Sequence, residues 1–401
     1  MRKIAAIVTI LVLISITGTS QDKKTPQFWF EKGEQALARK EYVAARAHFS
    51  ECLRLDNRFA DAYRLRAISQ EHLGENERAL TDYNIYVELK PEDPEALFSR
   101  GVLRFEANQF LPARQDFLKV LRAPKGETNT VYFGREKYNE SNGKIFTAQN
   151  GGKDYVYNYL GLIETKLKRY DVAIGWLDSA VKNSPNNASY LINRGSARLD
   201  KNDKAGAKAD FENALKLEPD NSLAIHNLAT LKAAAGEKES SELLLSEAIE
   251  RNKNLPYPRA DRAFQRMQKN DLAGALEDYN EVVKLEPRDY ENYLNRGLVK
   301  EKMKDLQGAL VDFSKAIELN DKDERSWLSR GNIMSKLARW KDAIEDYSVA
   351  IAHNPNYGLA FYNRAVANQH SGKLKEACDD LNKAIKFEVK VDVKMRDKVC
   401  R

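Results

Sequence analysis

The sequence is poor in the residues that build disulfide-rich, metal-binding or catalytic proteins. Its 401 residues include only 3 cysteines, 5 histidines and 11 prolines. Three cysteines are too few for a disulfide scaffold, and their odd number leaves at least one unpaired within the chain. The sequence has no CxxC or HExxH pattern and no Gly-rich phosphate loop, and its histidines are scattered. We therefore expect no metal, no cofactor and no enzymatic activity.

Long apolar runs are missing except at the N-terminus. There Arg2 and Lys3 precede a mostly apolar run from Ile4 to Ile16, and small residues follow up to Ser20. This pattern predicts a signal peptide over residues 1–20, cleaved after Ser20. The alternative, a membrane anchor, normally needs about 20 apolar residues. We expect an exported chain (periplasmic, envelope-associated or secreted) with no integral membrane segment after cleavage.

The charge is high but mixed in sign. Hydrophobic residues make up 42% of the chain and charged residues 31%, and the formal net charge is +6. This apolar content is too high for a disordered chain. Since 59 acidic residues are interleaved with the basic ones, we find no basic stripe and expect no nucleic-acid partner.

A 34-residue spacing organises most of the chain. Frames open at Asp154, Ala188, Ser222, Pro256, Tyr290, Glu324 and Gly358 with no insertion or deletion. Earlier frames open at Pro26, Ala60 and Pro94, once a single 26-residue insertion before Asp154 is allowed. We number the positions of each frame from 1 to 34. Self-similarity at such a period is typical of solenoids.

Fixed residue types recur at fixed positions of the frame. Position 8 is always Gly or Ala, position 20 is Ala in nine of ten frames, and position 24 is mostly aromatic or Leu. Apolar residues are spaced by 3 or 4 in both halves of the frame, which predicts two helices. Position 32 is often Pro, as in Pro287 and Pro355, and ends the second helix.

This pattern resembles the tetratricopeptide repeat, and the resemblance covers nearly all of the chain after residue 25. It implies an all-α fold in which antiparallel helix pairs stack into a right-handed superhelix, an α-solenoid. The first helix of each pair would line the inner wall. We expect repeats 1–3 over residues 26–124, an insertion over 125–153, repeats 4–10 over 154–391 and a C-terminal capping helix over 392–401.

Two positions vary together. The seven frames with Arg at position 7 are also the seven with Asp at position 23, while the other three lack both residues. The pairs are Arg66 with Asp82, Arg100 with Asp116, Arg194 with Asp210, Arg262 with Asp278, Arg296 with Asp312, Arg330 with Asp346 and Arg364 with Asp380. An unpaired buried ion typically costs about 3–5 kcal/mol. We therefore predict structural ion pairs within each helix pair; the alternative is a basic ladder on the inner wall for acidic ligands.

The insertion has a different composition, rich in Gly, Asn and Thr. Residues 128–133 and 144–148 have strand composition, and Asn142-Gly143 is a tight-turn signal. We predict a β-hairpin or a long loop. It either contacts a partner through Tyr132, Phe133, Tyr138 and Phe146 or simply packs locally.

The cysteines leave two alternatives open. Cys378 lies on the second helix of the last frame and Cys400 on the predicted cap, so they form either a disulfide or two free thiols. Cys52 occupies a small core position, and we expect it to be inert.

The resemblance also implies a partner-binding groove along the first helices. At positions 5, 9 and 12 its predicted lining is Phe30, Arg64, Ile68, Phe98, Val102, Phe105, Asn158, Leu162, Ile192, Phe264, Met267, Leu294, Leu298, Leu328 and Tyr362. Such a lining suits an extended or helical peptide, although the same side chains can instead pack between adjacent first helices. The Lys and Asn pattern with which some family members clamp a chaperone tail is not assembled around Asn193, Asn295 and Asn363.

The function that we expect is a non-enzymatic scaffold or adaptor that binds a protein or peptide partner in the cell envelope. The alternatives are an envelope structural component that acts through the insertion and the convex surface, and a regulatory subunit of an envelope enzyme.

Overall fold

The computed structural model describes residues 24–123, 131–133, 145–147 and 153–400. The predicted signal peptide lies outside these residues. Among the described residues, no helix combines the length and the apolar character needed to cross a bilayer.

The described chain is almost entirely helical, as the sequence predicts, and its helices come in pairs. The first helices of the pairs are α1 (Pro26–Ala38), α3 (Ala60–His72), α5 (Pro94–Glu106), α7 (Asp154–Lys166), α9 (Ala188–Asp200), α11 (Ser222–Ala234), α13 (Pro256–Gln268), α15 (Tyr290–Lys302), α17 (Glu324–Lys336) and α19 (Gly358–His370). The second helices are α2 (Tyr42–Leu55), α4 (Asn76–Leu89), α6 (Phe110–Arg122), α8 (Tyr170–Asn183), α10 (Lys204–Leu217), α12 (Lys238–Arg251), α14 (Leu272–Leu285), α16 (Leu306–Leu319), α18 (Trp340–His353) and α20 (Leu374–Lys386). Every first helix begins at position 1 of its frame and every second helix at position 17, so the predicted repeat frame is confirmed.

Local signals set the helix boundaries. The side chain of Asp93 accepts hydrogen bonds from the backbone N–H groups of Glu95 and Ala96, and Pro94 occupies the first turn, where its missing N–H costs nothing. Position 15, in the turn between the two helices, has a positive φ in all ten repeats, whether it is Gly, Asn, Lys or Ala. Within each unit, a left-handed residue there reverses the chain so that the second helix runs back along the first.

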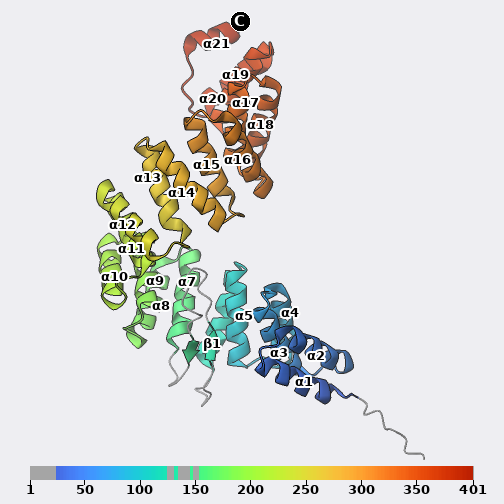
Figure 1. Ribbon diagram of the computed structural model, residues 1–401. Coiled ribbons are helices and arrows are strands. Elements are labelled where there is room, and N and C mark those ends of the chain that lie inside the picture. The colour runs from blue at the N-terminus through green and yellow to red at the C-terminus, as the bar shows by residue number, and fades with distance from the viewer. Residues whose placement is uncertain (1–23, 124–130, 134–144, 148–152, 401) are drawn as a thin grey trace, which may run out of the picture. The chain divides into compact units, whose positions relative to one another are not determined.

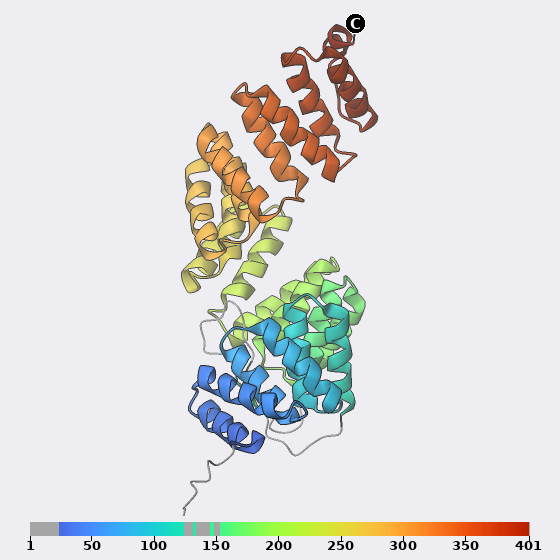
Figure 2. The ribbon, with the colours of Figure 1, turned by 90° about the vertical axis from the view of Figure 1, so that its right-hand side faces the viewer.

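The chain divides into two units, which we describe separately. The first contains α1 to α7 and the second α8 to α21. Within each unit, every helix packs against the next one along the chain (Figures 1 and 2). The core is accordingly a row of small clusters, each formed by neighbouring repeats.

Small residues at position 8 let the two helices of a pair approach closely. A Cβ atom placed on Gly297 of α15 would lie 2.6 Å from Cε1 of Phe313 on α16. Glycines at position 8 face Phe49, Phe117 and Phe211 in other repeats in the same way. In these four repeats the phenylalanine at position 24 occupies the space that a side chain at position 8 would need.

Two short strands lie in the insertion. β1 (Val131–Phe133) and β2 (Ile145–Thr147) form a two-stranded sheet. Tyr138 and the predicted Asn142-Gly143 turn lie outside the described residues, so the complete hairpin stays a prediction. At the base of the insertion, Nζ of Lys153 donates to the carbonyl oxygens of Leu121 and Ala123, at 2.6 and 3.0 Å, and so joins its end to the end of α6.

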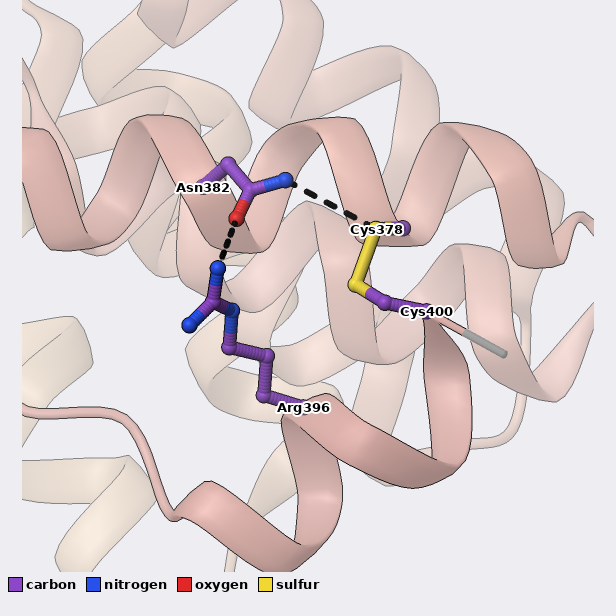
Figure 3. Close-up of a disulfide and its surroundings, with 4 residues drawn as sticks. All are labelled: Cys378, Asn382, Arg396 and Cys400. Carbon is purple, nitrogen blue, oxygen red and sulfur yellow. Dashed lines mark hydrogen bonds between the residues drawn. A yellow bond between two sulfur atoms is a disulfide. The ribbon is translucent and has the colours of Figure 1, made fainter.

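A seven-residue helix, α21 (Val393–Val399), follows the last repeat at the place predicted for a cap. Val399 is buried against Ala365, Ala377 and Leu381 of the last helix pair. Of the two alternatives for the cysteines, the structure has the disulfide between Cys378 and Cys400 (Figure 3). Cys52 is buried, and burial raises the pKa of its thiol to about 11.

Candidate functional site

All seven predicted Arg–Asp pairs are present within their helix pairs. In each, Nε and Nη2 of the arginine donate to the two carboxylate oxygens of the aspartate, at 2.6 to 3.0 Å. The aspartates are almost fully buried; Asp312, for example, is 1% exposed. Because both carboxylate oxygens hold the guanidinium groups in place, these arginines are structural and do not form a ladder of free cations.

The same arginines also join consecutive repeats. In six of the seven, Nη1 donates to a polar side chain at position 25 of the preceding repeat. Arg262 donates to Ser246 at 2.9 Å, and Arg296 donates to Asn280 at 3.1 Å. One half-buried guanidinium thus contacts two repeats and links them.

A second cation, which our sequence analysis missed, contacts four of the seven aspartates. It stands at position 11 of the repeat: Arg104, Arg198, Arg266 and Lys300. Nζ of Lys300 lies 2.7 Å from Oδ2 of Asp312. Position 11 carries a cation in some repeats and a neutral residue such as Met334 in others, so no constant signal marked it.

The predicted groove residues differ in their exposure, even at the same repeat position. Phe98, Ile192, Leu294 and Leu328, all at position 5, are buried. The ring of Phe98 packs against Phe117 of its own second helix and against Tyr155 and Tyr159 of the next first helix. For these four residues the structure favours the alternative of packing between neighbouring helices, because their side chains are not available to a partner.

The remaining predicted groove residues are more accessible. Ten are half-buried: Phe30, Arg64, Ile68, Val102, Phe105, Asn158, Leu162, Met267, Leu298 and Tyr362. Phe264 stands apart, with 48% of its surface exposed. The side chains of Tyr132, Phe133 and Phe146 in the insertion lie outside the described part of the structure. Their contact with a partner therefore stays a prediction.

Phe264 belongs to a cluster on two neighbouring first helices, α11 and α13. Tyr257, one residue after the start of α13, lies two helical turns before Phe264 on the same side of the helix and is 43% exposed. Leu223 of α11 is 39% exposed. We call Leu223, His226, Tyr257, Asp261 and Phe264 the α11–α13 surface.

His226 joins the two helices of this surface through one polar contact and one ring contact. Nε2 of His226 lies 2.9 Å from Oδ2 of Asp261, and the imidazole stacks on the ring of Tyr257 with the ring centres 6.4 Å apart. The Asp261 side chain remains half exposed. The result is a set of exposed apolar side chains beside an accessible carboxylate, which suits a polypeptide segment with an apolar residue near a basic one.

The described residues show no metal-ligand cluster. No group of three or more His, Cys, Asp or Glu side chains is arranged to hold a metal ion in the described ranges.

Comparison with known proteins gives matches along the array. Models described as tetratricopeptide repeat match residues 44–94, 64–127, 146–188, 188–221 and 290–323. The last two spans each coincide with one frame of the repeat.

Curated relatives are similar over part of their length. Mouse tetratricopeptide repeat protein 16 is 26% identical over 221 residues, which cover 53% of this chain and 27% of that protein. The human protein O-mannosyl-transferase TMTC3 is 25% identical over 219 residues, covering 51% of this chain and 24% of that protein. The chain thus spans about a quarter of the length of these relatives.

Two solved structures match the chain at low identity and with TM-scores below 0.5. The Cut9 and Hcn1 hetero-tetramer of the APC/C gives a TM-score of 0.47 at 14% identity and covers 94% of this chain and 96% of the other. YrrB, described as a TPR protein with an unusual peptide-binding site, gives a TM-score of 0.40 at 19% identity and covers 44% of this chain and 91% of the other.

The matches to tetratricopeptide repeat models agree with the repeated helix pairs. The chain belongs to the tetratricopeptide repeat family.

Proposed function

We propose that this chain is a non-enzymatic scaffold of the cell envelope that binds a segment of a partner protein along its first helices. The observation that carries this proposal is the exposure of Phe264 and Tyr257 on α13. Most predicted groove residues pack against their neighbours, whereas these two rings face solvent in the described chain. Large exposed aromatic side chains that lie close together are typical of binding sites.

The α11–α13 surface limits the chemistry of the partner. Exposed apolar surface on Leu223, Tyr257 and Phe264 takes apolar side chains, and Asp261 attracts a lysine or arginine. We infer a right-handed superhelix with these residues on its inner wall, as in other members of the family.

Export is a second part of the proposal. A chain with the predicted signal peptide reaches an oxidising compartment, where disulfides form and persist. The bond between Cys378 and Cys400 supports this localisation.

Two alternative functions share the envelope localisation but do not use the α11–α13 surface as the binding site. In the first, an envelope structural component binds through the insertion, with residues 125–153 forming a complete β-hairpin, and through the convex surface. In the second, the chain is a regulatory subunit of an envelope enzyme. Lys153 fixes the base of the insertion to α6, which supports a protruding element at this point.

Affinity capture with matched variants tests the proposal. The bait is the chain from Gln21 onward, purified and incubated with an envelope extract from its source, followed by binding measurements with the purified candidate. We expect Phe264→Ala and Tyr257→Ala to weaken binding, and Leu243→Ala on α12, which is 73% exposed, to leave it unchanged. Phe98→Ala is unsuitable because Phe98 is buried.

A deletion variant distinguishes the alternatives. Residues 125–152 are replaced by two glycines, so that Lys153 stays in place. Loss of binding in this variant alone, with full binding by Phe264→Ala, would show that the insertion makes the contact and would contradict the proposal.

A further inference from the structure

The net charge of the chain is concentrated at its two ends. Seven basic and three acidic residues between positions 383 and 401 contribute four of the six net positive charges, and Arg2 and Lys3 contribute the other two. The residues from 4 to 382 therefore carry no net charge. The evenly mixed surface that the composition predicts holds for the repeats but not for the C-terminal segment.

The cations of this segment are exposed and lie close together along the chain. They are Lys383 and Lys386 at the end of α20, Lys390 in the linker, and Lys394, Arg396 and Lys398 on α21. Within the described part of the chain, no carboxylate lies within salt-bridge distance of any of the six. This contrasts with the repeats, where buried aspartates hold the arginines at position 7.

The segment is held firmly against the last repeat. The disulfide joins Cys400 to Cys378 of α20, and Nη2 of Arg396 donates to Oδ1 of Asn382 at 3.1 Å (Figure 3). Val399 is 3% exposed. The backbone of α21 is therefore held in place, and its lysines project from an ordered helix.

Exposed aliphatic side chains lie among these cations. Val393, at the start of α21, is 71% exposed, and Ile385, near the end of α20, is 42% exposed. Cys400 pairs with Cys378 and Arg396 with Asn382, so the two helices run antiparallel. Ile385 and Val393 each lie seven residues from the bonded cysteine of the same segment, Cys378 and Cys400. Lys386 and Lys394 directly follow these two residues in the sequence.

We propose that this basic cap surface, formed by the six cations with Ile385 and Val393, docks on a bilayer that contains anionic phospholipids. Lysine ammonium groups attract the lipid phosphates, and the aliphatic side chains enter the interfacial region. The excess of cations and the two exposed aliphatic side chains suit the interface of an anionic bilayer, where apolar groups lie directly beneath the lipid phosphates. The α11–α13 surface is separate, and this inference does not depend on the proposed peptide binding.

Vesicle co-sedimentation tests the inference. The chain from Gln21 onward keeps every described helix and lacks the apolar N-terminal run. We expect it to sediment with vesicles of phosphatidylcholine and phosphatidylglycerol but not with phosphatidylcholine alone, and to be released by high salt. Replacing Lys390, Lys394 and Lys398 with Gln should weaken the binding about tenfold or more.

Matched controls make the result decisive. Lys253, Lys322 and Lys341 are exposed lysines on other parts of the second unit, and their replacement with Gln should leave vesicle binding unchanged. Val393→Ser should weaken vesicle binding but not binding to soluble polyglutamate. Absence of binding to anionic vesicles would overturn the inference, as would equal losses in the two lysine variants. If polyglutamate competes fully and Val393→Ser has no effect, the surface takes an acidic polypeptide and the lipid proposal is wrong.

Discussion

Arg330 of α17 and Asp346 of α18 form a two-pronged ion pair, with Nε donating to Oδ2 at 2.8 Å and Nη2 donating to Oδ1 at 2.7 Å. Asp346 is 4% exposed. The pair closes one helix pair of the repeat, and six others in the chain have the same geometry. Removing one partner of such a pair destabilises the fold strongly, because the other ion stays buried without a counter-charge. Replacing both partners with apolar residues changes the stability little.

Removal of one partner of this pair should therefore destabilise the chain strongly. We expect Arg330→Leu to lower the free energy of unfolding of its unit by about 3–5 kcal/mol. The double variant Arg330→Leu with Asp346→Leu should recover most of the loss. Urea unfolding followed by circular dichroism measures both, and additive losses in the double variant would refute the direct contact.

The second cation at position 11 makes a comparison possible between repeats. Asp312 is bound by both Arg296 and Lys300, whereas Asp346 has a neutral residue, Met334, at the corresponding position. We expect Arg296→Leu to destabilise the chain less than Arg330→Leu, because Lys300 still neutralises the buried carboxylate. Equal losses in the two variants would show that Lys300 contributes nothing.

Gly297 should not tolerate a methyl group. A Cβ atom there would lie 2.6 Å from Phe313, so Gly297→Ala should cost about 1–3 kcal/mol through overpacking. A Cβ atom placed on Gly175, in the helix α8, would have no neighbouring atom within 4 Å. Gly175→Ala should therefore stabilise the chain by about 0.5–1 kcal/mol, the usual gain in a helix. Thermal unfolding of both variants tests the contrast, and a loss of stability in Gly175→Ala would contradict it.

The cysteines should react in a defined order. Because Cys52 is buried and burial raises its pKa to about 11, we expect no labelling of the folded chain by iodoacetamide at pH 8. Unfolding without reductant should expose one thiol, and unfolding with reductant should expose three. Mass spectrometry counts the labels; two or more labels without reductant would show that Cys378 and Cys400 are not bonded.

Buried tyrosines should make the fold sensitive to alkali. Burial raises the pKa of Tyr347 to about 12, above its ordinary value of about 10. Between these values the folded chain keeps a proton that the unfolded chain releases, so stability is complete below pH 10 and falls as the pH rises toward 12. The effect for one such residue is on the order of 2 kcal/mol. Urea unfolding at pH 9 and pH 11 should show the decrease, and Tyr347→Phe should reduce the difference between the two pH values.

The sequence predicted the features that repeat. The Gly or Ala at position 8 and the apolar spacing located the start of every first helix, and the joint variation of positions 7 and 23 located contacts such as Arg296 with Asp312. The same helix contacts recur in ten repeats, so the same residue types recur at the same positions. A packing requirement that is repeated in this way can be recognised in a single sequence.

Features that occur once were harder to predict. Phe98 and Phe264 are both aromatic and both lie on first helices, yet the first is buried and the second half exposed. The difference depends on the neighbours of each residue, such as Tyr155 and Tyr159 around Phe98, which periodicity does not reveal. The pairing of Cys378 with Cys400 likewise depends on how a short helix returns to the last repeat, so both alternatives stayed open.

Site-specific photo-crosslinking in the source cells tests the central claim most directly. The photoreactive amino acid benzoylphenylalanine replaces Phe264 on the α11–α13 surface or, as the control, Leu243 on α12. We predict that the chain with the photoreactive residue at position 264 crosslinks to one partner protein, and that the chain with it at position 243 does not crosslink to that partner. The same partner captured from position 243, with nothing captured from position 264, would contradict binding along the first helices.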